Sequence, residues 1–348
     1  MKFEKTNNLS NQNTITLVAH NFKDDGKILN TLKGNTESIL MSDNDLIITV
    51  NIFQLARLKD LLKAEDLNLD QIYEDERIIW EGPNFKFDLT VDPLIYSIFN
   101  FSPDSFSTHV SNETSAFLRK AEDDLQNGAK VLEIGGKSTR PGFTEITVDE
   151  EWERIEKPLK ILKKEFPNVP ISVDTYNVEV MRRSLENGAD IINDINGFET
   201  EEKIDLLKQY DVGAVAMLNN RLKHETDIDS TLIENHFKEL LTQIDDKNIP
   251  RNRFSFDLGV GFSENSSLAD DLVKINAYSQ LSKLNVPLMI AISRKSFIQK
   301  ILDSEADRVT ISLFVELLMT LNNGRILRVH DVKETQYLLN LLKAIVID

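Results

Sequence analysis

The chain has 348 residues, enough for one large barrel or for two unequal domains. Hydrophobic residues make up 41% and charged residues 28%, a composition that can bury a sizeable core and that excludes wholesale disorder. With 40 Lys and Arg against 57 Asp and Glu, the net charge is −17, which argues against nucleic acid or an anionic membrane as a partner. An anionic ligand must therefore bind in a local cationic pocket.

The sequence contains no Cys, which excludes disulfides, thiolate metal sites and Cys nucleophiles. Met1–Ser10 is polar and lacks the apolar segment of a secretory signal. The longest apolar runs, such as Leu46–Val50, are far shorter than the roughly 20 residues that a membrane helix needs. We therefore expect a soluble, cytoplasmic protein.

Residues 1–83 are rich in Asn and Asp, and Leu46–Val50 is predicted as a strand that leads into a helix at Phe53–Leu62. Gly82 and Pro83 are typical of a boundary. We predict a small N-terminal α/β extension over 1–83, whose role the sequence does not indicate, and a second domain over 84–348.

From about residue 94 onward, short apolar runs of strand length alternate with amphipathic helical segments. The predicted strands are Leu94–Phe99, Lys130–Ile134, Ile171–Asp174, Asp190–Asp194, Gly213–Met217, Phe254–Asp257, Leu288–Ile292 and Arg325–Val329. Their number and order predict an α/β protein with a (β/α)8 TIM barrel. An open doubly wound sheet is the alternative, because a strand count does not prove closure.

Polar residues fall at the C-terminal ends of these strands, where TIM barrels build their active sites. They are Asn100, Asp174, Asn193, Asp194, Asp257, Ser293 and Arg328. Groups of this kind can bind a metal, act as acid and base, or bind a heterocycle that carries N–H donors. The simpler alternative is that Asp174 and Asn193 cap the helices that follow them.

Two loops near these strand ends allow both a structural and a functional interpretation. The loop Asn100–Ser107 is either a Pro-containing turn or a mobile loop in which Asn100 is an oxygen ligand to a hard cation and Asp104 a polar gate. The loop Gly135–Gly142 is either a flexible turn or an anion-binding loop, because paired glycines allow close backbone approach and Thr139 and Arg140 supply donors.

The last two predicted strands are followed by cationic segments, Ser293–Phe297 and Arg328–Asp331. Barrels often bind phosphate at these two loops. Lys295, Arg328 and His330 therefore predict an anion site, which would be the local cationic pocket that the acidic composition requires.

The ordered motifs resemble those of one family, dihydropteroate synthase. The matching strings are IFNFSPDSFS, LEIGGKSTRPG, SVDTY, GADIINDINGF, FSFDLGVGF, AISRKSF and RVHDVKET. The resemblance implies a transferase of folate biosynthesis that condenses 6-hydroxymethyl-7,8-dihydropterin pyrophosphate with p-aminobenzoate, giving 7,8-dihydropteroate and pyrophosphate. It also implies Mg²⁺ and a homodimer packed through late helices. The apolar helix predicted at Ile311–Leu321 offers a face for such a dimer, and core packing explains that face equally well.

The same resemblance implies a role for individual residues. The expected catalytic residues are Asp104, Thr139, Arg140 and Lys295. The expected pterin contacts are Asp174, Asn193, Met217, Asp257, Phe262 and Lys295. The expected pyrophosphate contacts are Thr139, Arg140, Arg328 and His330. Ser293 and Ser296 are expected to bind p-aminobenzoate, and Asn100 is the expected protein ligand to Mg²⁺.

The chain departs from the family pattern in its loops. Thr108 replaces an acidic residue of the first loop, and Lys137 stands where Glu precedes STRPG. These departures motivate a second hypothesis, a catalytically weak pterin-binding paralogue that acts as a sensor, carrier or partner subunit. A pterin-dependent methyltransferase with a corrinoid partner is a third hypothesis, which the STRPG, SRKSF and RVHDV strings disfavour.

Overall fold

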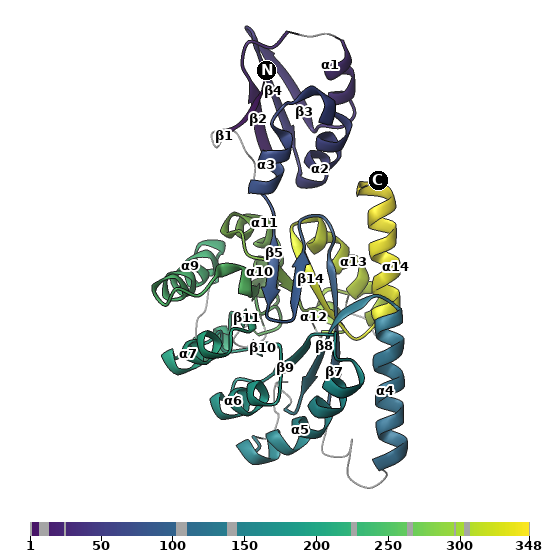
Figure 1. Cartoon of the computed structure of the whole chain (residues 1–348), viewed down its shortest axis with the longest axis vertical. Coiled ribbons are helices and arrows are strands. Elements are labelled where there is room, and N and C mark those ends of the chain that lie inside the picture. The colour runs from purple at the N-terminus through teal and green to yellow at the C-terminus, as the bar shows by residue number, and fades with distance from the viewer. Residues whose placement is uncertain are drawn as a thin grey trace.

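The computed structural model describes the whole chain except residues 1, 7–13, 24–25, 102–109, 138–144, 224–227, 263–266, 296, 303–306 and 348. The first residues form a small α/β domain built on an antiparallel sheet of order β1-β2-β4-β3 (Figure 1). Its elements are β1 (Phe3–Thr6), β2 (Ile15–Ala19), α1 (Lys27–Leu32), β3 (Ser38–Ser42), β4 (Asp45–Val50), α2 (Ile52–Leu61) and α3 (Leu69–Asp75). The sheet and helices enclose a hydrophobic core of their own.

Within this domain, α2 begins with a capping box. The Asn51 side chain accepts from the Gln54 amide, and the Gln54 side chain accepts from the Asn51 amide, so two donors that a helix start leaves unpaired are satisfied. The predicted strand and helix of the extension correspond to β4 and α2. The sequence did not predict β1, β2 or β3.

A hairpin of β5 (Ile79–Gly82) and β6 (Phe85–Asp88) follows, and the boundary expected at 83–84 falls in its turn. Trp80 is fully buried, and its ring lies 5.1 Å from that of Phe85 and 6.3 Å from that of Tyr96 in the first barrel strand. Its indole N–H donates to the Arg253 carbonyl at 3.0 Å. The hairpin therefore belongs to the packing of the barrel interior.

The remaining strands form a closed parallel barrel of order β10-β11-β12-β13-β14-β7-β8-β9, which confirms the predicted TIM barrel. The strands are β7 (Leu94–Asn100), β8 (Ala129–Gly135), β9 (Ile171–Asp174), β10 (Ile191–Asp194), β11 (Gly213–Met217), β12 (Phe254–Asp257), β13 (Leu288–Ile290) and β14 (Gly324–Val329). β13 is two residues shorter than predicted because the chain turns there, with the Lys295 amide bonded to the Ile292 carbonyl at 3.0 Å.

Helices surround the barrel in the order that the amphipathic segments predicted (Figure 1). They are α4 (Val110–Gln126), α5 (Val148–Glu165), α6 (Val178–Glu186), α7 (Glu201–Tyr210), α8 (Asn220–Lys223), α9 (Ser230–Asp246), α10 (Leu268–Asn276), α11 (Tyr278–Leu281), α12 (Phe297–Leu302), α13 (Arg308–Leu321) and α14 (Val332–Leu342). Within the described parts of the chain, none is long and apolar enough to cross a membrane.

The N-terminal domain lies at the end of the barrel where the strands begin, opposite the mouth (Figure 1). Arg325, at the start of β14, is fully buried, and its guanidinium lies 5.3 Å from the ring centroid of Phe53 in α2. The same helix packs against the short π-helix Lys343–Ile347 that extends α14. The extension is thus in contact with the barrel but remote from the strand ends that carry the predicted site.

We expect Trp80→Ala to lower the free energy of unfolding of the barrel by about 3–5 kcal/mol, because it opens a cavity beneath the strands and leaves the Arg253 carbonyl unpaired. The urea midpoint followed by circular dichroism measures the loss. The control is Lys86→Ala in the same hairpin, an exposed residue whose loss should change stability by no more than about 0.5 kcal/mol. Equal midpoints for the two variants would contradict the role of the hairpin.

Candidate active site at the barrel mouth

The barrel brings together most of the residues that the sequence singled out. Those that the structure describes at or beside the C-terminal strand ends are Asn100, Asp174, Asn193, Met217, Asp257, Phe262, Ser293, Lys295, Arg328 and His330. Asp104, Thr108, Thr139, Arg140 and Ser296 lie outside the described residues.

Arg328 connects two carboxylates across the barrel. Its Nε donates to Oε1 of Glu133 at 2.7 Å, and its Nη2 donates to Oδ2 of Asp174 at 2.8 Å and also contacts Glu133. The acids come from β8 and β9, whereas Arg328 comes from β14, so one planar guanidinium fixes three strands at the mouth. Sequence spacing did not predict these partners, because they are 195 and 154 residues away.

Glu133 is a site residue that the sequence reasoning missed. It is fully buried, and its Oε2 accepts from the Tyr96 hydroxyl and the Asn193 amide, both at 2.9 Å. With Arg328 on Oε1, both of its oxygens have donors, which is what a buried carboxylate requires. The available signal was an acidic residue inside the apolar run Lys130–Ile134, at a position that faces the barrel interior.

The titration of this cluster follows from its burial. Burial raises the pKa of Asp174 to about 7, against the opposing effect of the Arg328 guanidinium. For Arg328, burial disfavours the charged form, but Glu133 and Asp174 outweigh it and hold its pKa above the ordinary value. The guanidinium therefore stays charged while Asp174 changes charge near neutral pH.

A second polar pair, Asp257 and Lys295, lies between β12 and the loop after β13. Oδ1 of Asp257 accepts from the Gly259 amide at 2.8 Å, and the Lys295 ammonium donates to the Val260 carbonyl. Burial raises the pKa of Asp257 and lowers that of Lys295 to about 8, and each charge opposes the shift of the other. The pair thus offers an acceptor and a cationic donor on one wall of the mouth.

His330 corrects one expectation from the sequence, which grouped it with cations. Burial, with the nearby Arg328 charge, lowers the pKa of His330 to about 4, so its imidazole is neutral at physiological pH. Its Nδ1 lies 3.3 Å from Oγ of Ser293, and the Ser293 hydroxyl also accepts from the His330 amide at 3.3 Å. His330 can therefore contribute a hydrogen bond to an anion but no charge.

The helix-capping alternative is wrong for Asp174 and Asn193. The side chain of Asn177, not of Asp174, accepts from the first amides of α6, and the Asn193 amide donates to Glu133. Asp194 is different: it accepts from the Lys203 ammonium and from the Phe198 amide, both at 2.9 Å, so it organises the loop after β10. Asp174 and Asn193 thus remain at the mouth for a role other than capping.

Lys137, where the family pattern has Glu, is engaged with two neighbours. Its ammonium contacts the Glu145 carboxylate and the Tyr176 hydroxyl, and it lies 4.2 Å from the centroid of the Tyr176 ring. The Tyr176 hydroxyl also donates to Glu145 at 2.8 Å. Burial opposes its charge, but the bonds to Glu145 and Tyr176 raise the pKa of Lys137. The reversed charge at this position is therefore neutralised locally.

Asn100 offers the oxygen that the Mg²⁺ expectation needs. It ends β7 and pairs with Gly135 at the end of β8. In the described part of the chain, His, Asp and Glu form no cluster that could hold a metal ion by itself. A single amide oxygen fits Mg²⁺ of the kind that binds mainly through substrate phosphates and water.

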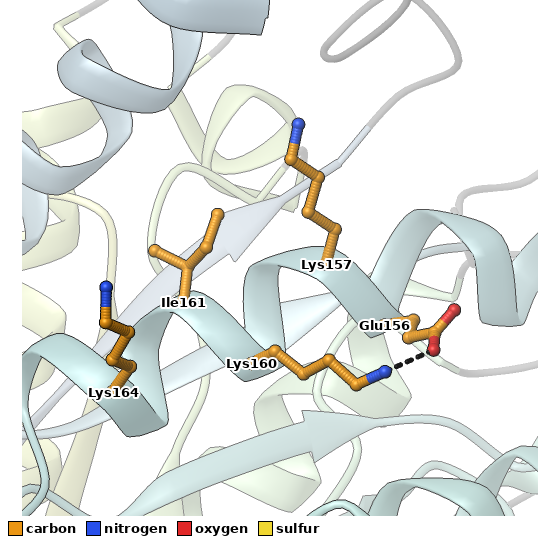
Figure 2. A pocket seen from close by; sticks show the side chains of 5 residues that line it. All are labelled: Glu156, Lys157, Lys160, Ile161 and Lys164. Atoms are coloured by element: carbon orange, nitrogen blue, oxygen red, sulfur yellow. Dashed lines mark hydrogen bonds and ion pairs between the residues drawn. The ribbon is translucent and has the colours of Figure 1, made fainter.

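A hollow on α5, away from these strand ends, is lined by the side chains of a single helix: Glu156, Lys157, Lys160, Ile161 and Lys164 (Figure 2). Lys160 donates to Glu156 at 2.5 Å, an ordinary pair one helical turn apart. We interpret this hollow as a solvated helix face and place the candidate site at the mouth.

Comparison with known proteins gives a consistent result. Residues 96–330 match the family described as "Pterin binding enzyme". A dihydropteroate synthase of Streptococcus pyogenes is 31% identical over 265 residues, which cover 74% of this chain and 97% of that protein. One from Bacillus subtilis is 32% identical over 258 residues, covering 72% and 88%. The crystal structure of Xanthomonas albilineans dihydropteroate synthase with 4-aminobenzoic acid superposes with a TM-score of 0.70 at 30% identity, covering 77% of this chain and 98% of that one.

The raised pKa of Asp174 predicts a pH dependence of stability. In the unfolded chain this carboxyl ionises near 3.8 and in the folded chain near 7, so between these values the folded state retains a proton that the unfolded state has released. Rising pH should therefore destabilise the wild type relative to Asp174→Asn, by up to about 1.4 kcal/mol per pH unit.

Urea midpoints of the wild type and Asp174→Asn, measured from pH 5 to pH 7.5, test this prediction. Asp123→Asn, a change on the exposed face of α4, should follow the wild type at every pH. Parallel curves for the wild type and Asp174→Asn would contradict the assignment.

Proposed function

Since the chain belongs to the pterin-binding enzyme family, we propose that the residues described at the barrel mouth carry out its reaction. The chain has the function of a dihydropteroate synthase, a transferase that condenses 6-hydroxymethyl-7,8-dihydropterin pyrophosphate with p-aminobenzoate to give 7,8-dihydropteroate and pyrophosphate. The observation that supports the site best is the pairing of a buried acceptor, Asp257, with a cationic donor, Lys295, on one wall, and Arg328 on the other.

The pterin ring would bind between these walls. Of the two carboxylate oxygens of Asp257, only Oδ1 accepts a hydrogen bond from the described residues. Oδ2 is therefore left to accept from the amino group and ring N–H of a pterin. Asp174 and Asn193 would bind the same polar edge, and the Lys295 ammonium would donate to the ring carbonyl oxygen. Met217 and Phe262 would contact the ring faces. A heterocycle without these donors would leave buried acceptors unpaired and bind poorly.

The pyrophosphate would lie beside Arg328 and the neutral His330, together with Thr139 and Arg140 of the second loop. The Asn100 amide oxygen would be the protein ligand to Mg²⁺. When bound, the ion supplies positive charge to the leaving pyrophosphate. Arg328 keeps its charge across the physiological range, so this wall favours the departing anion at every pH at which the fold is stable.

The reaction exchanges one bond for another at the pterin methylene carbon. The C–O bond to pyrophosphate breaks, the arylamine nitrogen attacks the same carbon, and the nitrogen loses one proton to solvent. We propose that pyrophosphate departs first, because the electron-rich dihydropterin stabilises the methylene cation. Ser293 and Ser296 would hold the p-aminobenzoate carboxylate, and Asp104 would close the first loop. No covalent enzyme intermediate is required, so the protein acts by positioning and charge stabilisation.

We also propose a homodimer that packs through the last helices. Large apolar side chains are exposed on α13 and α14: Phe314, Leu318, Leu321, Tyr337 and Leu341. Contiguous exposed apolar side chains of this kind are typical of interfaces. The dimer and a cytoplasmic location stay predictions.

Pyrophosphate release tests the function directly. The wild type should release pyrophosphate from 6-hydroxymethyl-7,8-dihydropterin pyrophosphate over repeated turnovers only when both p-aminobenzoate and Mg²⁺ are present. Asp257→Asn should weaken pterin binding by roughly 100-fold or more. Asparagine has one acceptor oxygen where aspartate has two, and its NH2 group would face the N–H donors of the pterin. Asp123→Asn on α4 is the matched control and should behave as wild type in calorimetry and turnover.

Each of the other outcomes has a definite meaning. Sustained release of pyrophosphate without p-aminobenzoate would indicate a hydrolase. Tight pterin binding without release would favour the pterin-binding paralogue. Wild-type affinity in Asp257→Asn would contradict the proposed pterin pocket.

Arg328→Lys separates the anion role of Arg328 from its structural role. Lysine keeps the positive charge but cannot bridge Glu133 and Asp174 with one planar group. We expect roughly tenfold or greater loss of affinity for the pyrophosphate-bearing pterin, and a smaller loss for the bare pterin, by calorimetry with both ligands. Arg182→Lys, in a surface ion pair on α6, is the control. Equal losses for the two ligands would contradict the anion role.

A further inference from the structure

The turn after β12 is bonded to three cationic side chains. It consists of residues 258–262 and connects Asp257 to Phe262. Three consecutive carbonyl oxygens accept from different side chains: that of Gly259 from Lys274 at 2.8 Å, that of Val260 from Lys295, and that of Gly261 from Arg221 at 2.6 Å. Each cation comes from a different segment, so the turn is tied to α8, α10 and the loop after β13.

The amides of the same turn are bonded to carboxylates. The Gly259 amide donates to Asp257 at 2.8 Å, and the Gly261 amide donates to Asp271 at 2.6 Å. Both glycines have positive φ, +66° and +83°, and a Cβ on Gly259 would lie 2.0 Å from the Leu218 carbonyl oxygen. The backbone is therefore held in a conformation that only glycine adopts readily, with charged partners on both sides.

Lys274 is the unusual member of this set. It is fully buried, and burial lowers its pKa to about 8 against the opposing charge of Asp271. Burying an ammonium group is costly, and well-packed apolar residues at such positions often give equal or greater stability. Stability alone therefore gives no reason for a lysine at this place.

Phe262 ends the turn, and its ring lies beside two of these three cations. The Arg221 guanidinium and the Lys295 ammonium each lie 4.9 Å from the centroid of its ring. The Lys295 ammonium has three N–H donors, so one can stay on the Val260 carbonyl while another donates to a pterin oxygen. The flanking carbonyls would keep their donors, because Lys274 and Arg221 belong to other elements.

We propose that Lys274 and Arg221 are positioning residues, which hold the 258–262 turn so that Asp257, Phe262 and Lys295 are in the correct place for the ligand. The inference rests on the proposed function for its ligand. It goes beyond that function by assigning a role in pterin binding to a lysine inside α10 that faces no ligand.

Lys274→Met tests the proposal, because methionine is of similar length and removes only the donor and the charge. Amide hydrogen exchange of the free protein should become roughly tenfold or more faster at the turn, because the Gly259 carbonyl loses its partner. Affinity for 6-hydroxymethyl-7,8-dihydropterin should fall roughly tenfold or more, with a raised KM for its pyrophosphate. The urea midpoint should fall only modestly, because the unpaired Gly259 carbonyl is offset in part by no longer burying an ammonium group. Arg221→Met should act in the same direction, and Lys283→Met on the surface should have no effect.

The outcomes separate this inference from the function on which it rests. Unchanged exchange at the turn in Lys274→Met would overturn the inference whatever the wild type catalyses. Faster exchange with unchanged pterin affinity would also overturn it. A lowered urea midpoint with wild-type KM would show a purely structural lysine. A wild type that neither binds pterin nor releases pyrophosphate would overturn the proposed function, and this result is visible without any variant.

Discussion

The arrangement of the mouth depends on one interaction, the guanidinium of Arg328 between the carboxylates of Glu133 and Asp174. Two buried acids 41 positions apart in sequence would repel each other without a cation between them, and a buried cation without them would be unstable. The second carboxylate oxygen of Glu133 accepts from Tyr96 and Asn193, so the position of Glu133 also fixes these two side chains. The orientation of the acceptors and the retention of a positive charge at the mouth are consequences of the same contact.

This contact also shows how a chain of net charge −17 could hold the proposed pyrophosphate group. The cations at the mouth are not excess charge exposed to solvent. Arg328 is paired with acids, Lys295 lies beside Asp257, and His330 is neutral, so little net charge has to be buried before a ligand arrives. An incoming anion would compete with fixed carboxylates for existing donors. Such donors are already oriented, so they require little reorganisation when charge develops on the leaving group.

The sequence was sufficient to predict the barrel and to place each described mouth residue at or beside the end of a strand. Strand length, alternation and the residue that ends a strand are local properties. It failed where contacts join distant segments. Glu133 was missed because the partners named above come from three other strands, and Lys274 was missed because an amphipathic helix gives no sign that a lysine faces inward. In the N-terminal domain, the short strands β1 and β3 are polar or exposed at sheet edges, so they carry little of the periodicity that identifies a strand.

Lys137 shows how a departure from a family pattern should be weighed against its surroundings. A lysine in place of the usual glutamate reverses one charge beside the second loop, and in isolation this counts against an anion-handling site. Here the lysine is bonded to Glu145, eight residues later, and to Tyr176 in the next loop, so the three groups satisfy one another. Because Lys137 comes just before the 138–144 segment and Glu145 just after it, the ion pair ties together the two ends of the loop that carries Thr139 and Arg140. The lysine therefore adds no net charge at the two ends of that loop. A paired lysine of this kind is a weaker argument for lost turnover than an unpaired charge would be.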